Sequence, residues 1–362
     1  MIAHVLNRFK SESSQPHSGT QEWNRYFKLK FLKTIWRPVR NVENTDIIAT
    51  SERQLDVSLS KIFREFLKIQ GLASLHLTTT FGQMHYYDSA PGSSEHPFIM
   101  LHGIGSSGQC FAILALMLKE KRRVILPDLF HFCGFSTTNN AVMNHSEHVK
   151  SIVELIENLA PQGCDFCGLS LGGWLGLKIA AQRPELIKKI ILLNSAGLQH
   201  GHYQLRDTLS FLSWKKFKVI YPGIMRAFPY EGTIGLSNLF RRSVFRLLKD
   251  DAVRDFIKTV HTADFLEGDL SKIKCPVLVL WGREDRLLSP QIAETYAKNL
   301  SHVEAWWVEN CAHILCLEAP VVVYEACLRF LNLSFNDDNT FTKMMRRTAV
   351  AFDLIPIASK IE

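Results

Sequence analysis

Residues 164–176, CDFCGLSLGGWLG, place a serine between two glycines where a strand pattern changes into a helix pattern. The first six residues are almost entirely apolar, as in a strand buried on both faces, and a helix pattern follows from residue 171. A serine on such a sharp turn exposes its hydroxyl, and bulky residues in place of Gly168 and Gly172 would clash with the turn. The stretch therefore predicts that Ser170 is a nucleophile rather than only the start of a helix.

Buried strand patterns alternate with helix patterns on both sides of this stretch. Such alternation predicts a mainly parallel, doubly wound α/β sheet with helices on both faces. The alternation stops over residues 198–266, which carry helix patterns only, so we expect a helical insertion there. Strands are expected at residues 75–90 (a hairpin turning at Gly82), 96–103, 123–129, 163–170, 187–197, 275–282 and 302–310, and helices at residues 108–120, 146–160, 171–184, 289–300 and 319–333.

Five segments follow from this pattern. Residues 71–197 and 267–333 form the predicted α/β core, interrupted by residues 198–266, and residues 334–362 are a tail without a clear pattern. Residues 1–70 form an N-terminal extension that mixes aromatic side chains with lysine and arginine. Such a mixture is typical of a helix that lies on a membrane surface, or of one that docks on the body of the protein, and both interpretations stay open.

A serine hydroxyl is a weak nucleophile without a base, so a histidine and an acid that orients it are expected. Asp285 follows the predicted strand at 275–282, and His313 follows the strand at 302–310. Both therefore lie at the carboxyl edge of the sheet, where open α/β sheets form their active-site crevice. Glu284, beside Asp285, is an alternative acid, whereas Asp128 is expected to brace a nearby loop.

An oxyanion hole is predicted from residues 102–105, HGIG, after the first buried strand. The flanking Gly103 and Gly105 let the backbone N–H of Ile104 face a reacting carbonyl, and the N–H of Leu171 supplies a second donor. His102 is expected to support the loop rather than to transfer protons.

Residues 75–333 resemble the α/β-hydrolase superfamily of serine hydrolases. The resemblance is carried by LHGIG (101–105), GLSLGG (168–173), LWGREDRLLSP (280–290) and AHILCLEAP (312–320), and the chain is similar to capped esterases and monoacylglycerol-lipase-like members. It implies an eight-stranded sheet with a helical cap after the sixth strand, Ser170 as nucleophile, His313 as general base and Asp285 as the acid. Residues 130–136, FHFCGFS, depart from the glycine-rich loop usual in the family.

The remaining composition excludes several classes. A net charge of +7 over 362 residues is too mild to predict a nucleic-acid partner, and no stretch approaches the length of a membrane-spanning helix. Cys164 and Cys167 lie within a strand, so we interpret them as core thiols and expect neither a metal nor a cofactor. We expect a cytoplasmic chain with reduced cysteines and a peripheral membrane contact through the N-terminal segment or the cap. The other histidines (His131, His145, His148, His200, His202 and His261) are expected at the surface or in the cap.

The sequence thus predicts a serine carboxylic ester hydrolase that acts through an acyl-enzyme on an apolar, lipid-derived ester such as a monoacylglycerol or a lysolipid. Two alternatives stay open: a C–C bond hydrolase or acyltransferase with the same triad, and a ligand sensor without enzymatic activity.

Overall fold

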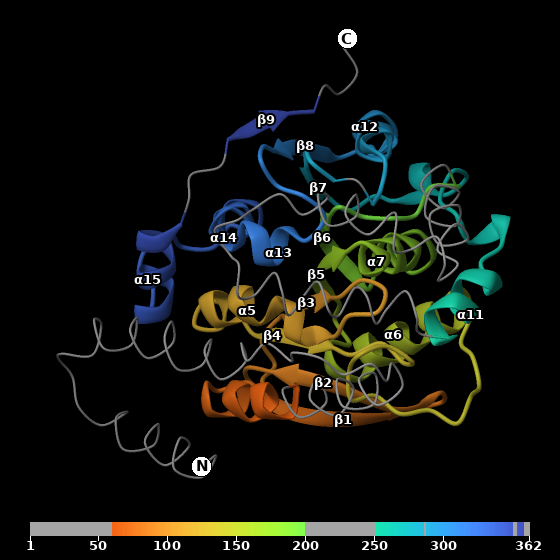
Figure 1. The fold of residues 1–362 in the computed structure, drawn as a ribbon, viewed down its shortest axis with the longest axis horizontal. Coiled ribbons are helices and arrows are strands. Elements are labelled where there is room, and N and C mark those ends of the chain that lie inside the picture. The colour runs from red at the N-terminus through yellow and green to blue at the C-terminus, as the bar shows by residue number, and fades with distance from the viewer. Residues whose placement is uncertain (1–59, 200–250, 286, 350–352, 358–362) are drawn as a thin grey trace, which may run out of the picture. The chain divides into compact units, whose positions relative to one another are not determined.

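A computed structural model describes residues 60–199, 251–285, 287–349 and 353–357. The chain divides into two units, Met1–Leu59 and Ser60–Glu362, and every described residue belongs to the second. The described part of this unit is built on one nine-stranded sheet with the strand order β1-β2-β4-β3-β5-β6-β7-β8-β9 (Figure 1). Its strands are β1 (Ala73–Thr79), β2 (Gly82–Asp88), β3 (Phe98–Leu101), β4 (Val124–Pro127), β5 (Cys164–Leu169), β6 (Ile187–Leu193), β7 (Val277–Gly282), β8 (Val303–Val308) and β9 (Leu354–Pro356).

Helices cover both faces of the sheet, and each face has its own apolar core. One core joins the sheet to α6 (His145–Leu159), α7 (Leu171–Gln182) and α12 (Pro290–Asn299). The other core joins it to α5 (Ala112–Leu118), α13 (Leu315–Glu318) and α14 (Pro320–Phe330). Figure 1 shows these two sets on opposite sides of the strands. The other described helices are residues 60–69, α11 (Asp251–Thr259), α15 (Thr340–Thr348), and the short η2 (Gly108–Phe111), η4 (Thr262–Asp264) and η5 (Leu270–Lys272).

Local sequence explains where the central elements begin. β3 and β5 are buried along their whole length, which accounts for their apolar sequences. Asn144 begins α6 with a capping box, because its side chain accepts the Glu147 N–H while Glu147 reaches back to the Asn144 N–H. Ser289 caps α12, and Pro290 occupies its first turn, where no intrahelical donor is needed.

The central strands run in one direction. The pairs β3·β4, β3·β5, β5·β6, β6·β7 and β7·β8 are parallel, whereas β1·β2, β2·β4 and β8·β9 are antiparallel. The carboxyl ends of β3, β5, β6, β7 and β8 therefore meet at one edge of the sheet, and the segments that leave this edge carry the candidate site.

The predicted α/β-hydrolase sheet is confirmed, but the predicted number of strands is wrong. Among the described residues the sheet has nine strands rather than eight, because the segment after residue 333 contributes β9 beside β8. The tail also forms α15. All three residues of β9 are exposed, so no apolar pattern marks the strand in the sequence. Most of the predicted cap, residues 200–250, lies outside the described residues, as do residues 1–59 of the predicted extension.

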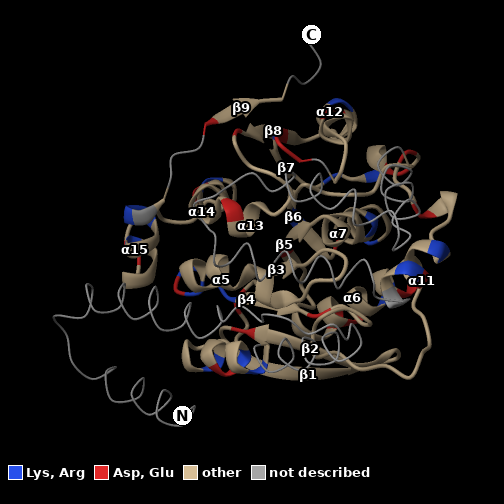
Figure 2. Ribbon diagram, in the orientation of Figure 1, with Lys and Arg blue, Asp and Glu red and all other residues tan. Residues whose placement is uncertain are grey.

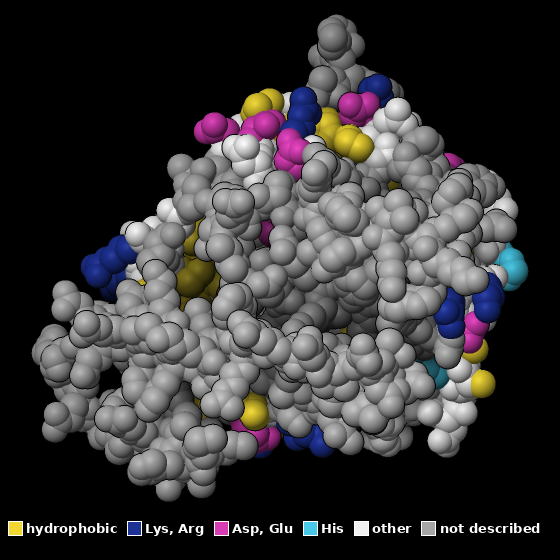
Figure 3. Space-filling model, in the orientation of Figure 1, with side chains coloured by type: hydrophobic (Ala, Val, Ile, Leu, Met, Phe, Trp, Pro, Cys, Tyr) yellow, Lys and Arg dark blue, Asp and Glu magenta, His cyan; other side chains and the backbone are white. Residues whose placement is uncertain are grey.

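Charges on the described elements are mixed in sign. Figure 2 shows lysine and arginine alternating with aspartate and glutamate on the helices and loops around the sheet. On the face drawn in Figure 3, basic side chains likewise stand next to acidic ones. None of the described helices has both the length and the apolar character of a membrane span.

Candidate active site

Ser170 occupies a strained turn between β5 and α7. Its backbone has φ 53° and ψ −116°, a left-handed φ that a non-glycine residue adopts only where the surroundings enforce it. Two backbone bonds hold the turn: the Ser170 N–H donates to Leu193 O at 3.0 Å, and the Ala196 N–H donates to Ser170 O at 3.1 Å. The side chain thus sits at the N-terminus of α7, the geometry described for a nucleophile elbow.

The glycines around Ser170 allow close backbone approach. A side chain at Gly168 would collide with the backbone of Gly173, and one at Gly172 would collide with the carbonyl of Leu101 at the end of β3. The first turn of α7 is therefore packed directly against neighbouring strand ends, which explains why both flanking positions need glycine.

Asp285 and His313 are brought together as predicted. His313 Nδ1 lies 2.8 Å from Asp285 Oδ2, and both residues are only 5% exposed. Because a carboxylate oxygen only accepts, the Nδ1 atom carries the proton, and Nε2 is left to accept one. The neighbouring Glu284, the alternative acid, instead donates its backbone N–H to Cys311 O. The geometry thus favours Asp285.

Two further residues hold this pair, and the sequence analysis missed both. Asn194, directly after β6, donates from Nδ2 to Asp285 Oδ2 at 2.5 Å. Glu318 accepts the N–H groups of Ala312 and Ile314, the two neighbours of His313, at 2.8 and 2.7 Å. Burial raises the pKa of Glu318. Asn194 is a polar residue directly after a buried strand at the active-site edge, but the sequence does not indicate that its side chain reaches Asp285.

Ser170 and His313 both lie at the carboxyl edge, but the described residues include no hydrogen bond between Ser170 Oγ and His313 Nε2. In enzymes without bound substrate this bond is often long and closes only in the complex. Ser170 directly follows β5, Asp285 follows β7, and His313 follows β8. The three residues thus occur in the order Ser, Asp, His along the chain.

The predicted oxyanion loop lies against Ser170. A Cβ added at Gly103 would stand 3.0 Å from Ser170 Cβ and 3.6 Å from its Oγ, so the loop backbone passes directly beside the hydroxyl. Gly105 has φ 64°. Among the described residues, no backbone or side-chain acceptor takes a hydrogen bond from the N–H of Ile104 or of Leu171. Both amides are therefore available to an oxyanion.

His102 supports this loop by two hydrogen bonds. Its Nδ1 lies 2.7 Å from Gly103 O, and its Nε2 accepts the Leu129 N–H at 2.9 Å. Complete burial lowers the pKa of His102, so the ring is neutral and donates from Nδ1. These hydrogen bonds agree with the prediction that His102 supports the loop.

Asp128 braces the same region from behind. It accepts the Gly108 N–H at 2.7 Å and the Phe135 N–H at 2.9 Å, and it pairs with His85 Nδ1 at 2.7 Å. Burial alone would raise the pKa of Asp128, but its polar contacts, first the hydrogen bond with His85, hold this pKa below its usual value. His85, which no sequence pattern singled out, thus links β2 to the loop at residues 130–136.

An imidazole–aromatic cluster fills the space behind the loop. His148 stacks on Phe132 at 5.6 Å between ring centroids and meets Phe256 of α11 edge-on at 5.5 Å. His145 lies 4.3 Å from the ring of Trp174, which stacks on Phe265 at 5.1 Å. The cluster comprises these six residues: Phe132, His145, His148, Trp174, Phe256 and Phe265.

The prediction that His145 and His148 lie at the surface or in the cap is wrong. Each is 1% exposed, and burial lowers the pKa of each to about 3. They sit in the first turn of α6, where they pack against aromatic side chains instead of facing water. His261 is exposed, His131 is half-buried, and His200 and His202 lie outside the described residues.

Cys164 and Cys167 are buried inside β5, and burial raises the pKa of both thiols. A raised pKa disfavours the thiolate that redox chemistry and metal binding require. Within the described ranges, no group of three or more histidine, cysteine, aspartate or glutamate residues is arranged to hold a metal ion.

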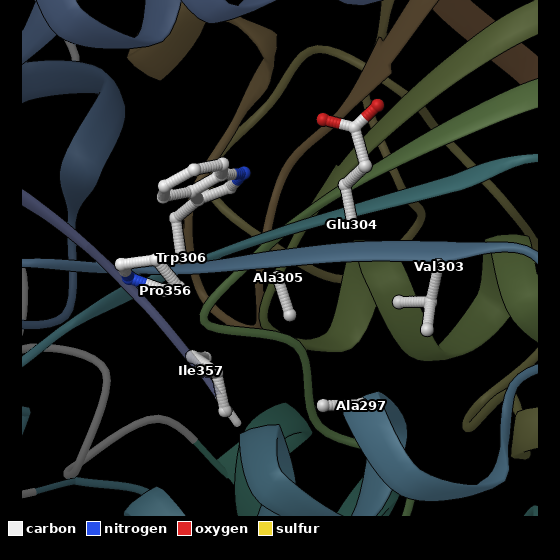
Figure 4. A pocket seen from close by; sticks show the side chains of 7 residues that line it. All are labelled: Ala297, Val303, Glu304, Ala305, Trp306, Pro356 and Ile357. Carbon is white, nitrogen blue, oxygen red and sulfur yellow. The ribbon is translucent and has the colours of Figure 1, made fainter. Parts of the chain in front are cut away.

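A surface pocket lies elsewhere on the sheet. It has a volume of about 180 Å³ and is formed by α12, β8 and β9. Figure 4 shows Ala297, Ala305 and Ile357 on one side of β8, with Glu304 and Trp306 on the other. None of the candidate catalytic side chains lines this pocket, so the pocket is separate from the candidate active site. The full lining is Ala297, Val303, Glu304, Ala305, Trp306, Pro356 and Ile357.

Comparison with known proteins agrees with this geometry. A model of the alpha/beta hydrolase family matches residues 98–326. The chain is 24% identical to an uncharacterized carboxylesterase, nap, of Bacillus subtilis (strain 168), covering 72% of this chain and 86% of that protein. It is 22% identical to monoacylglycerol lipase ABHD6 of Homo sapiens, covering 67% and 77%.

Solved structures share the fold. The crystal structure of a bacterial membrane phospholipase A superposes with a TM-score of 0.65 at 19% identity, covering 79% of this chain and 94% of that chain. At this identity the likeness speaks for the fold alone.

Proposed function

The chain belongs to the alpha/beta hydrolase family, and on that basis we propose that it hydrolyses carboxylic esters through an acyl-enzyme formed on Ser170. The observation that carries the proposal is the Asp285–His313 hydrogen bond at the same sheet edge where Ser170 directly follows β5. The relatives named as a carboxylesterase and a monoacylglycerol lipase support an ester-acting hydrolase.

In the proposed reaction, His313 Nε2 takes the proton of Ser170 Oγ as the oxygen attacks the ester carbonyl. The N–H groups of Ile104 and Leu171 donate to the oxyanion that forms, and each such donor is worth about 3–4 kcal/mol in the transition state. His313 then protonates the leaving alcohol. Water, deprotonated by His313, releases the acid and restores Ser170.

We propose that the substrate is an apolar ester of the monoacylglycerol or lysolipid type. Two half-buried apolar side chains stand at the oxyanion loop: Ile104 belongs to the loop, and Phe132 contacts His102. The imidazole–aromatic cluster extends this apolar surface inward. Such surroundings favour an acyl chain over a charged acid. The relative named as a monoacylglycerol lipase supports the same substrate class.

A panel of p-nitrophenyl esters of graded chain length tests this proposal. The wild-type chain should hydrolyse them with kcat/KM rising with chain length, and a fluorophosphonate should label it. Ser170→Ala should abolish both activities, whereas Ser271→Ala, which changes an exposed serine outside the site, should retain both. Full hydrolysis by Ser170→Ala would sink the assignment. Inertness toward every ester would favour the sensor interpretation.

We further propose a peripheral contact with anionic membranes through the basic stretch at residues 23–40, which lies outside the described residues. Co-sedimentation with phosphatidylserine vesicles measures it. Changing Lys28, Lys30 and Lys33 together to glutamate in the full chain should release the protein into the supernatant. Equal sedimentation of both forms would contradict the contact.

A further inference from the structure

We propose that Asn194 is a positioning residue of the triad, because its side-chain amide fixes the carboxylate of Asp285 and, through it, the ring of His313. The inference rests on the proposed function. Asn194 directly follows β6, the strand between the one that ends at Ser170 and the one that leads to Asp285, and it is completely buried.

The two ends of the Asn194 amide have different partners. The Gly282 N–H at the end of β7 donates to Asn194 Oδ1 at 3.2 Å, whereas Asn194 Nδ2 donates to Asp285 Oδ2 at 2.5 Å. The orientation of the amide is settled chemically, because a backbone N–H can only donate and a carboxylate oxygen only accepts. One bond therefore ties β6 to β7, and the other acts on the catalytic acid.

The oxygen that Asn194 holds is the one that His313 uses. Asp285 Oδ2 accepts from Asn194 and from His313 Nδ1, while Oδ1 accepts the N–H groups of Leu287 and Leu288 at 2.8 and 3.1 Å. Without the amide donor, the His313 imidazole would be the one hydrogen-bond partner left to Oδ2 among the described residues. The carboxylate could then turn, and the ring would lose its fixed direction toward Ser170.

Backbone conformation limits which residues can stand here. Asn194 has φ 45°, a left-handed value that asparagine and aspartate tolerate far better than most non-glycine residues. Asn194→Asp is therefore the sharpest test, since it keeps the size, the backbone preference and an acceptor for Gly282. It replaces only the donor that faces Asp285 with a second carboxylate oxygen.

In Asn194→Asp the two carboxylates repel unless they share a proton. We expect fluorophosphonate labelling of Ser170 to slow at least tenfold at pH 8. The added negative charge favours the protonated imidazole, which cannot act as a base. The pH at which labelling is half-maximal should therefore move upward by about one unit. KM for a p-nitrophenyl ester should change less than twofold, because Asn194 does not face the substrate.

Asn299→Asp is the matched control, because Asn299 is exposed at the end of α12 and its Nδ2 donates to Thr295 O, away from the site. Asn194→Gly serves if the aspartate variant does not fold, since glycine accepts the same φ and removes both bonds; it should lower kcat about tenfold.

Wild-type kcat and a wild-type pH midpoint in the Asn194 variants would overturn the inference, as would a wild-type chain that no fluorophosphonate labels. A wild-type chain that is labelled but hydrolyses no ester would instead overturn the proposed function alone, and the labelling profile would still decide the role of Asn194.

Discussion

Acidification from pH 7.5 to 5.0 should weaken the folded state through two histidines that the proposed reaction does not use. His145 and His148 are buried in the first turn of α6, and burial lowers the pKa of each from 6.5 to about 3. The folded pKa is thus below the unfolded one. Between pH 6.5 and 3 the unfolded chain binds more protons, so the stability contributed by neutral burial is complete above pH 6.5 and is lost as the pH falls.

The size of this loss follows from the two pKa values. At pH 5.0 each histidine is almost fully protonated in the unfolded chain and still neutral in the folded one. Linkage then gives a loss of about 2 kcal/mol per histidine relative to pH 7.5, or about 4 kcal/mol for the pair. A loss of that size is a large fraction of the stability of an ordinary domain.

Urea unfolding followed by tryptophan fluorescence at both pH values measures the effect. His148→Phe keeps an aromatic ring beside Phe132 and Phe256 but cannot take up a proton, so the variant should lose about 2 kcal/mol less than the wild type on acidification. Any constant cost of the larger ring cancels in this difference. Phe256→Leu, a packing change in the same cluster without a titrating group, should lose as much as the wild type. Equal losses in His148→Phe and the wild type would refute the reasoning.

Three further substitutions test the site. Asp285→Asn should lower kcat about 10⁴-fold with little change in KM, because an amide donor facing His313 favours the wrong imidazole tautomer; a loss under tenfold would contradict the triad. Glu318→Gln should destabilise the fold by about 1–3 kcal/mol in urea titrations and lower kcat, since an amide can accept only one of the two N–H groups beside His313. Gly172→Ala should lower the free energy of unfolding by about 3 kcal/mol or abolish folding, because its Cβ meets the Leu101 carbonyl; wild-type stability would show that the elbow can shift.

The residues placed by backbone rules could be predicted from the sequence. Ser170, Asp285 and His313 each follow a strand with a clear apolar pattern, and parallel strands bring such positions to one edge whatever the details of packing. The same rule placed the loop of Gly103 beside Ser170. Each of these predictions needed only the order and direction of the strands, and short apolar patterns in the sequence indicate both.

Residues whose importance depends on a side-chain partner could not be found this way. The sequence near Asn194 does not indicate that its side chain contacts Asp285. Likewise, the sequence near Glu318 does not indicate that its carboxylate accepts the N–H groups beside His313. Such contacts depend on loop conformations that no periodicity encodes. β9 was not predicted for a related reason: its three exposed residues at the sheet edge show no alternation between apolar and polar positions.

The two buried histidines show why composition alone misleads near a helix start. Polar residues in a first turn usually face water, and the capping residues Asn144 and Glu147 strengthen that interpretation of α6. Here the turn is covered by Phe256 of α11 and by Trp174 of α7, so the imidazoles are packed as aromatic rings and titrate far below their usual pH. Because Phe132 of the same cluster also meets His102 edge-on, the packing that keeps His148 neutral is continuous with the support of the oxyanion loop. His148→Phe should therefore delay acid unfolding of this region.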